Sequence, residues 1–240
     1  MMIYFLTSSS CTPGLPSLNP ANGFVDELKK ALPLPVHALF ITSAPDDVGF
    51  TDMVSASTRK DFANSGILFD TYHTLDRRSA DKAEEFVKQA NLIILSGGHT
   101  PTENFFFADI RLKELLQDYH GVLVGISAGS MNSAELVYAQ PEEAGEAIDP
   151  DFQKFLPGLG LTEVMIIPHY QIIKDSILDG KKLFEEVTYP DSFGHTFYAF
   201  PDGAFLLGRD GREELRGEIY QIKDGVLQQI SREGDIIRLH

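Results

Sequence analysis

The sequence predicts an α/β fold: a three-layer α/β/α sandwich with a mostly parallel sheet and antiparallel strands near the C-terminal end. Two observations lead to this prediction. Short apolar runs alternate with segments of helical periodicity through the first two thirds of the chain. After about residue 193, β-rich segments separated by Asp-Gly pairs replace that alternation.

The apolar runs have the length and composition of strands that are buried on both faces, as in a parallel sheet. Because each run is flanked by turn residues or helical segments, we expect these runs to form the central sheet. They comprise residues 3–8, 36–43, 66–72, 92–98, 121–127 and 164–170.

The segments between them carry apolar residues at spacings of three and four, which predicts helices over residues 22–32, 79–90 and 101–119. The last of these includes three consecutive phenylalanines at 105–107. Their helical spacing with Leu112, Leu115 and Leu116 favours core packing, or a subunit contact in a homodimer, over a cofactor-binding motif.

The C-terminal segments predict antiparallel strands, because Asp-Gly between alternating apolar residues is a strong hairpin signal. No linker, internal repeat or low-complexity tract interrupts the sequence. We therefore expect residues 1–240 to form a single α/β domain.

Composition excludes several functional classes. The formal net charge of -15 disfavours binding to a nucleic-acid backbone, and no apolar run reaches the length of a membrane span. The single cysteine, Cys11, cannot form an internal disulfide, and no Cys/His cluster predicts a metal site. The first apolar run lacks a basic flank, so we expect a buried strand rather than a signal peptide, and a cytoplasmic protein.

The sequence Gly-Ile-Ser-Ala-Gly at 125–129 has the Gly-x-Ser-x-Gly pattern of a nucleophile elbow. A predicted strand precedes it, and the helix-compatible residues 128–139 follow it. The glycines would allow the sharp turn that exposes the Ser127 hydroxyl above the sheet. By itself the motif is equally compatible with a plain strand-to-helix turn in which Ser127 caps the helix.

A second glycine pair, Gly97-Gly98, ends the predicted strand at 92–98, before a helix expected to open at Thr100 and Pro101. If this strand neighbours the one before Ser127, the amides of Gly98 and Ala128 could form an oxyanion hole. The alternative is that both glycines only permit the chain to leave the strand.

A serine nucleophile needs a base and a carboxylate that orients it. His169 is the candidate base, because it follows an apolar run and Pro168 at a predicted strand end, although a lone histidine is usually structural. Asp202 lies in a turn after another predicted strand, whereas Glu142 follows the nucleophile helix. We favour Asp202, because a strand-end turn fixes a side chain better than the segment around Glu142.

In combination, the segments LSGGHT, GISAGS, PHY and FPDG resemble the dipeptidase E (aspartyl dipeptidase) and cyanophycinase family of serine peptidases. The resemblance implies a class I glutamine-amidotransferase-like, flavodoxin-like fold. It also implies Ser127 as nucleophile, His169 as base, Gly98 and Ala128 as the oxyanion hole, and Asp202 or Glu142 as the acid. No cofactor is implied.

Two departures from the family pattern concern substrate binding. His99 replaces an asparagine that is frequent in the family and is expected to change a contact near the substrate. An arginine-bearing segment that suits a substrate carboxylate is replaced by residues 176–187, where Lys181 or Lys182 could substitute only as a point charge. A preference for aspartate is therefore doubtful.

These features predict a serine peptidase that hydrolyses short peptides through an acyl-enzyme. An amidase or esterase acting on another small acyl substrate would use the same groups. A glutaminase-type amidotransferase would need a cysteine at the elbow, where this chain has Ser127. A noncatalytic small-molecule-binding protein of the same fold is the remaining alternative.

Overall fold

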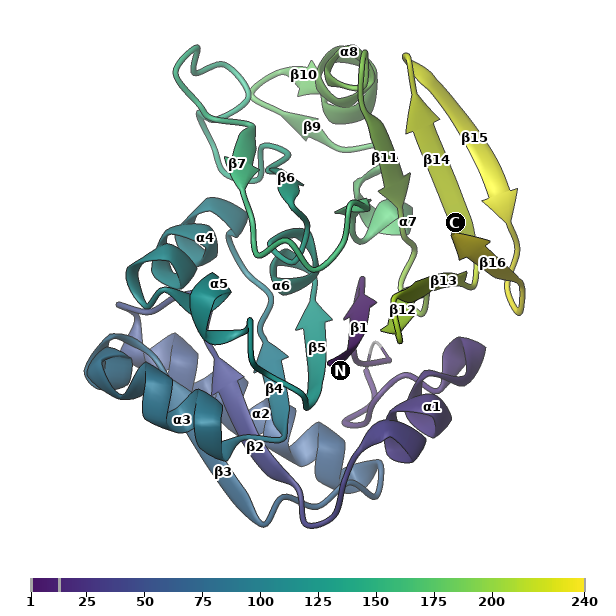
Figure 1. Ribbon diagram of the computed structural model, residues 1–240. Coiled ribbons are helices and arrows are strands. Elements are labelled where there is room, and N and C mark those ends of the chain that lie inside the picture. The colour runs from purple at the N-terminus through teal and green to yellow at the C-terminus, as the bar shows by residue number, and fades with distance from the viewer. Residues whose placement is uncertain (1, 13, 240) are drawn as a thin grey trace.

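The computed structural model describes residues 2–12 and 14–239, and its largest sheet has eight strands within these ranges. Five neighbouring strands are parallel, and three antiparallel strands extend the edge beyond β1 (Figure 1). The spatial order is β16 (Ile236–Leu239), β13 (Arg212–Arg216), β12 (Phe205–Arg209), β1 (Ile3–Thr7), β5 (Val122–Ile126), β4 (Leu92–Leu95), β2 (His37–Ile41) and β3 (Thr71–Leu75).

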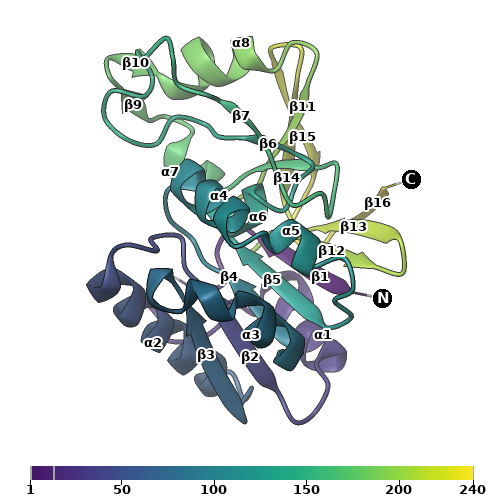
Figure 2. The same cartoon turned by 60° about the vertical axis from the view of Figure 1, so that its left-hand side comes forward.

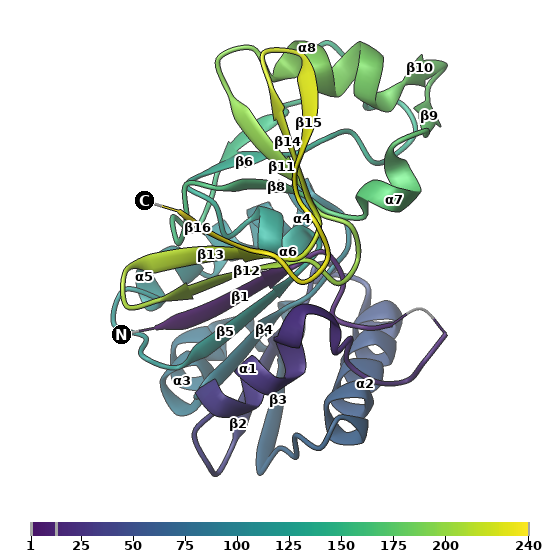
Figure 3. The same cartoon turned by 90° about the vertical axis from the view of Figure 1, so that its right-hand side faces the viewer.

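Helices cover both faces of this sheet. In Figure 2, α3, α4 and α5 lie over one face, and Figure 3 shows α1 and α2 on the other. The helices are α1 (Phe24–Ala31), α2 (Val48–Asn64), α3 (Ala83–Gln89), α4 (Thr100–Asp109), α5 (Leu112–Leu115), α6 (Ala128–Met131), α7 (Tyr170–Ile173) and α8 (Tyr189–Asp191), with 3₁₀ turns at η1 (Ala21–Gly23) and η2 (Arg77–Lys82) and a π-helical turn at η3 (Leu183–Thr188). The layers confirm the predicted α/β sandwich.

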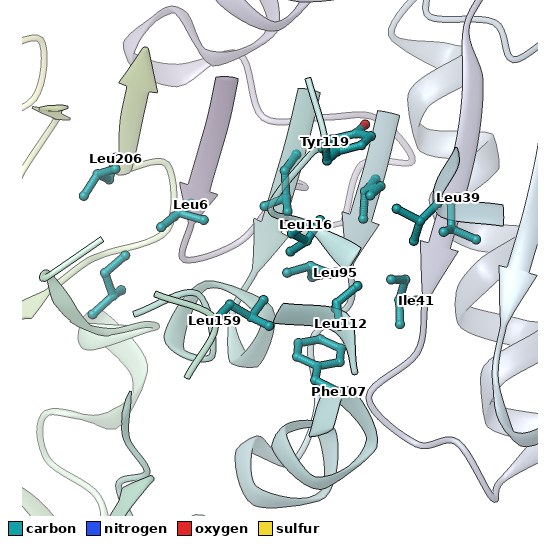
Figure 4. Packing of buried hydrophobic residues seen from close by; sticks show 14 of the residues in the cluster. Leu6, Leu39, Ile41, Leu95, Phe107, Leu112, Leu116, Tyr119, Leu159 and Leu206 are labelled. Atoms are coloured by element: carbon teal, nitrogen blue, oxygen red, sulfur yellow. The ribbon is translucent and has the colours of Figure 1, made fainter. Parts of the chain in front are cut away.

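Successive strand residues explain why both faces are covered. In β1, Phe5 packs toward α1, whereas Leu6 belongs to the core on the opposite face, and both are fully buried. Strands β2, β4 and β5 alternate in the same way. Figure 4 shows the second of these cores, where Leu6 and Leu95 of the sheet lie near Phe107 and Leu112 of the helices.

A second, four-stranded sheet stands above the first (Figures 1 and 3) and has the order β15 (Val226–Ser231), β14 (Ile219–Lys223), β11 (Thr196–Ala199) and β8 (Met165–Ile167). The run at 164–170 was expected in the central sheet, but β8 pairs with β11 of this second sheet instead. One face of this second sheet packs with Tyr138 and Phe184 in a separate core that includes Ile167, whereas Ile166 and Ile219 belong to the core around Leu6. Two short hairpins, β6 (Leu136–Tyr138) with β7 (Phe155–Pro157) and β9 (Ile177–Leu178) with β10 (Lys181–Lys182), complete the architecture.

The predicted C-terminal hairpins are confirmed. Asp210-Gly211 joins β12 to β13 and Asp224-Gly225 joins β14 to β15, with positive φ at all four residues. Between β11 and β16 the chain crosses from one sheet to the other three times, because β11, β14 and β15 belong to the second sheet and β12, β13 and β16 to the first.

Several predicted element boundaries were wrong. Residues 66–70 precede β3 rather than forming it, and the helix expected over 101–119 is interrupted at Arg111, whose φ is 55°. Only one turn of helix, α6, follows Ser127 before the chain enters β6. Residues 128–139 therefore form a helical turn and a strand, not a long helix.

None of the helices in residues 2–12 and 14–239 combines the length and apolar composition needed to cross a lipid bilayer.

Candidate active site

Ser127 occupies a strained turn between β5 and α6. Its φ of 50° and ψ of -111° are unusual for a residue with a side chain. Hydrogen bonds on both sides hold the turn: Ser127 N donates to Thr7 O of β1, and Gly129 N donates to Ser96 O beyond β4, each at 3.0 Å. Gly129 is required by close packing, because a Cβ there would lie 2.6 Å from Leu95 Cβ. This is the backbone geometry of a nucleophile elbow.

His169 lies beside Ser127, although it comes from the end of β8 in the second sheet. Its Nε2 is 3.0 Å from Ser127 Oγ, and its Nδ1 is 2.8 Å from Asp202 Oδ1. An ionised carboxylate can only accept, so Nδ1 carries a proton and Nε2 is the acceptor for the Ser127 hydroxyl. The structure therefore brings together the three side chains that the sequence singled out.

Ser8 is a site residue that the sequence analysis missed. Its hydroxyl donates to Asp202 Oδ1 at 2.8 Å and accepts from the backbone N of His169 at 2.7 Å. Ser8 directly follows β1, so it lies at the carboxyl end of a parallel strand, the edge where site residues of this fold class gather. That position at the end of a predicted strand was the sequence signal from which Ser8 could have been identified as a site residue. Gln171 adds a further restraint by accepting from Asp202 N at 3.0 Å.

The electrostatics at Asp202 favour its ionised form. Burial works to raise the pKa of this carboxyl, but hydrogen bonds from His169 and Ser8 outweigh burial, and the net effect is a pKa below the ordinary value. Asp202 is therefore a carboxylate at neutral pH and can orient the His169 ring and stabilise its cation.

Glu142, the alternative acid, has different partners. Its Oε1 accepts from Thr100 Oγ1 at 2.5 Å and from Thr100 N at 3.3 Å. Although the Glu142 residue is partly open to solvent, desolvation of its carboxyl raises the pKa above the usual value. Among the described residues, the ring nitrogens of His169 bond to Ser127 and Asp202 rather than to Glu142.

Gly98 and Ala128, the predicted oxyanion-hole residues, are both close to Ser127. Gly98 and Ser127 line one cavity, and Ala128 follows Ser127 directly. Within the described residues, neither amide donates to a backbone carbonyl, so both remain available to another acceptor. Gly98 also has to be glycine, because a Cβ there would collide with the Ser43 hydroxyl.

His99 does not extend into the cavities beside Ser127. It forms the N-cap of α4, directly before the expected helix start at Thr100, and its ring bonds to Thr102 Oγ1 and Glu146 Oε1, both at 2.7 Å. His99, Glu143 and Glu146 bring possible metal-ligand atoms within 4.8 Å of one another. The other Glu146 oxygen, however, already accepts two backbone amides, so internal hydrogen bonds account for this arrangement.

The two candidate lysines are not placed for a substrate carboxylate. Lys181 Nζ donates to the backbone carbonyl of Ala147 at 2.8 Å, and Lys182 is exposed with Glu185 at 3.8 Å. Neither lysine lines a cavity that contains Ser127. These positions do not favour either lysine as a point-charge substitute for the arginine of the family pattern.

Two cavities meet at Ser127 and His169. The first, of about 380 Å³, lies toward α7 and β9, and the second, of about 630 Å³, extends toward α2.

Cys11 is far from Ser127 in the sequence but lines the second cavity, and its thiol donates to Asp61 Oδ2 at 3.2 Å. Burial raises the pKa of the Cys11 thiol to about 11, so it stays protonated and is not a competing nucleophile at neutral pH.

Two solved structures share the fold. A peptidase from an acI-B1 Actinobacterium is 19% identical, with a TM-score of 0.67 over 100% of this chain and 97% of its own. A candidate peptidase E protein from Listeria monocytogenes EGD-e is 16% identical, with a TM-score of 0.59 over 96% of this chain and 100% of its own. At these identities the likeness concerns the fold, and no curated protein sequence matches the chain.

The sequence similarity to a known family is extensive. Residues 4–215 match the family described as peptidase family S51, which is the dipeptidase E family. The match begins in β1, ends in β13 and includes Ser8, Ser127, His169 and Asp202. This chain therefore belongs to peptidase family S51 and is a peptidase.

Proposed function

We propose that this peptidase hydrolyses short peptides with Ser127 as nucleophile, His169 as general base and Asp202 as the orienting carboxylate. The observation that carries the proposal is the continuous chain of hydrogen bonds from Ser127 Oγ through both nitrogens of His169 to Asp202. A nucleophile, a base and an orienting group within hydrogen-bond reach are the requirements for acyl transfer.

In the first half of the reaction, Ser127 Oγ attacks the carbonyl carbon of the scissile bond while its proton moves to His169 Nε2. The amides of Gly98 and Ala128 donate to the oxyanion that forms. The C–N bond then breaks as His169 returns its proton to the leaving amine, and the acyl group remains as an ester on Ser127.

In the second half, His169 Nε2 takes a proton from water while the hydroxide attacks the ester. The C–Oγ bond breaks, Ser127 Oγ recovers the proton from His169, and the carboxylic acid leaves. Asp202 stays ionised throughout and stabilises the imidazolium in both halves, as its lowered pKa favours.

The size of the cavities supports short substrates. Volumes of about 380 and 630 Å³ suit small-molecule ligands, so each cavity can accept a side chain or terminus flanking the scissile bond.

The lone thiol of Cys11 supports a reducing compartment such as the cytoplasm.

The test is hydrolysis of a dipeptide panel by the purified protein and by Ser127→Ala. We expect Ser127→Ala to lower kcat/KM by about 10³-fold or more with an unchanged circular dichroism spectrum. Ser17→Ala, in the loop before α1 and outside both cavities, is the control and should keep wild-type turnover.

The same proteins should differ in labelling by a fluorophosphonate probe, which requires an activated serine. Labelling of wild type and Ser17→Ala but not of Ser127→Ala supports the proposed nucleophile. Near-normal peptide hydrolysis by Ser127→Ala contradicts the mechanism, whereas hydrolysis of short acyl esters without any peptide hydrolysis contradicts the substrate class.

A further inference from the structure

The cavity of about 380 Å³ beside Ser127 has a mainly apolar wall. Several elements contribute to it: α6, the segment before Glu142, α7, the β9 strand and the start of η3. Its apolar residues include Met131, Pro141, Ile173, Ile177, Leu178 and Leu183. Since Ser127 and His169 line the same cavity, whatever occupies it lies directly beside the reacting bond.

The exposure of this wall is graded from floor to rim. Met131 and Leu183 are 4% and 5% exposed and form the buried floor, whereas Ile177 at the rim is 68% exposed. A large exposed aliphatic side chain beside a nucleophile gains from being covered by another apolar group. The wall therefore has apolar surface that a bound side chain would remove from water.

The charged groups around the cavity disfavour an acidic occupant. Among its described lining residues there is no lysine or arginine. The basic group present, His169, is already engaged with Ser127 and Asp202, and Glu142 adds a carboxyl to the wall. A substrate carboxylate would enter without a cationic partner and next to another acid, which costs free energy.

We propose that this cavity is a specificity pocket for an aliphatic side chain, such as leucine or methionine, on a substrate residue adjoining the scissile bond. The assignment rests on the proposed peptidase mechanism at Ser127. It extends that mechanism by naming the substrate class: short peptides with an aliphatic rather than an acidic residue beside the cleaved bond.

The first test is a dipeptide panel with leucine, methionine, aspartate or lysine paired with alanine in both orders. In one of the two orders, kcat/KM for leucine and methionine should exceed that for aspartate and lysine by about 10-fold or more. Equal or faster cleavage of the aspartate dipeptides in both orders overturns the assignment.

The second test uses two matched variants, because Ile177 and Ile172 are similarly exposed, at 68% and 65%, but only Ile177 lines the cavity. Ile177→Arg should reduce the ratio of leucine to aspartate cleavage by about 10-fold, since it adds a cation at the rim. Ile172→Arg should leave the ratio unchanged. Equal ratios in the two folded variants also overturn the assignment.

These experiments distinguish a failure of the pocket assignment from a failure of the proposed mechanism. Peptide hydrolysis that depends on Ser127 but shows no aliphatic preference in either order contradicts the pocket and leaves the mechanism standing. If wild type cleaves none of the peptides, the proposed mechanism fails and the pocket assignment fails with it.

Discussion

At the scale of single residues, the two candidate acids differ in what they touch. Asp202 bonds to His169 Nδ1 and Ser8, whereas Glu142 bonds to Thr100 at the start of α4. An acceptor on Nδ1 fixes the ring so that Nε2 faces the nucleophile, and Asp202 is the acceptor in that position. The geometry thus supports Asp202 as the orienting group and leaves Glu142 as part of the cavity wall.

We predict that Asp202→Asn lowers kcat by about 10³- to 10⁴-fold, because an amide nitrogen can favour the wrong ring tautomer of His169. Glu142→Gln should lower kcat by about 10-fold at most, because it keeps the shape of a group that does not contact His169. Steady-state kinetics of both variants at neutral pH provide the comparison. The reverse ranking would identify Glu142 as the orienting acid.

The pKa shifts of Asp202 and Glu142 predict opposite trends of protein stability with pH. The folded-state pKa of Asp202 is lowered from 3.8, so its ionised form stabilises the fold above about pH 4, and this contribution disappears as pH falls through the folded-state pKa. The folded-state pKa of Glu142 is raised from 4.5 by burial, so its contribution is greatest in acid and disappears as pH rises through that pKa.

Denaturant unfolding between pH 3 and pH 7 should show this difference. As pH falls, the stability advantage of wild type over Asp202→Asn should shrink, while its advantage over Glu142→Gln should grow. Parallel changes for the two variants would contradict the pKa shifts on which the prediction rests.

At the scale of elements, the turn between β5 and α6 depends on close backbone packing more than on helix propensity. The predicted long helix after Ser127 is replaced by a single turn and β6, yet the serine keeps the strained backbone of an elbow. The strain persists because hydrogen bonds to β1 and to the residue after β4 hold the turn. Gly129 is the residue that lets α6 approach β4 so closely.

Gly129→Ala should therefore destabilise the protein by about 1–3 kcal/mol and reduce turnover, because its Cβ would lie 2.6 Å from Leu95 Cβ and 2.7 Å from Leu95 O. Gly49→Ala in the first turn of α2 is the opposite case. Its nearest neighbour would be Asp47 Oδ1 at 3.7 Å, so a gain of about 0.4–1 kcal/mol is expected. Urea unfolding of both variants measures the contrast, and equal effects would contradict the packing argument.

At the scale of the whole molecule, the site lies where the two sheets meet. Ser127 follows a strand of the first sheet, His169 follows a strand of the second, and Asp202 lies on the connection between β11 and β12 that joins them. The apolar pocket, in turn, is closed by α7 and β9 on the side of the second sheet. The reacting groups and the pocket therefore depend on how the two sheets dock.

The formal net charge of -15 also acts on the molecule as a whole. We expect kcat/KM for a net-anionic dipeptide to rise severalfold between about 10 and 150 mM salt, as the Debye length falls from about 30 to 8 Å. A net-neutral leucine dipeptide should change little. Initial-rate assays of both dipeptides over this salt range provide the measurement. Equal salt dependence of kcat/KM for the two dipeptides would contradict long-range repulsion. The aliphatic preference should persist at high salt.

By itself, the sequence determined four of the five parallel strands of the central sheet, the turn at Ser127 and the C-terminal Asp-Gly hairpins, because local periodicity and turn residues encode such features. It placed β3 too early in the chain. It misplaced residues 164–170 in the first sheet, since an apolar run does not say which strand it will pair with. Tertiary structure alone decided the rest. His169 meets a nucleophile 42 residues before it and a carboxylate 33 residues after it, and Ser8 joins them from 161 residues away. The apolar pocket likewise exists only once residues from several elements pack around it, because its shape and charge belong to their mutual arrangement and not to any one segment.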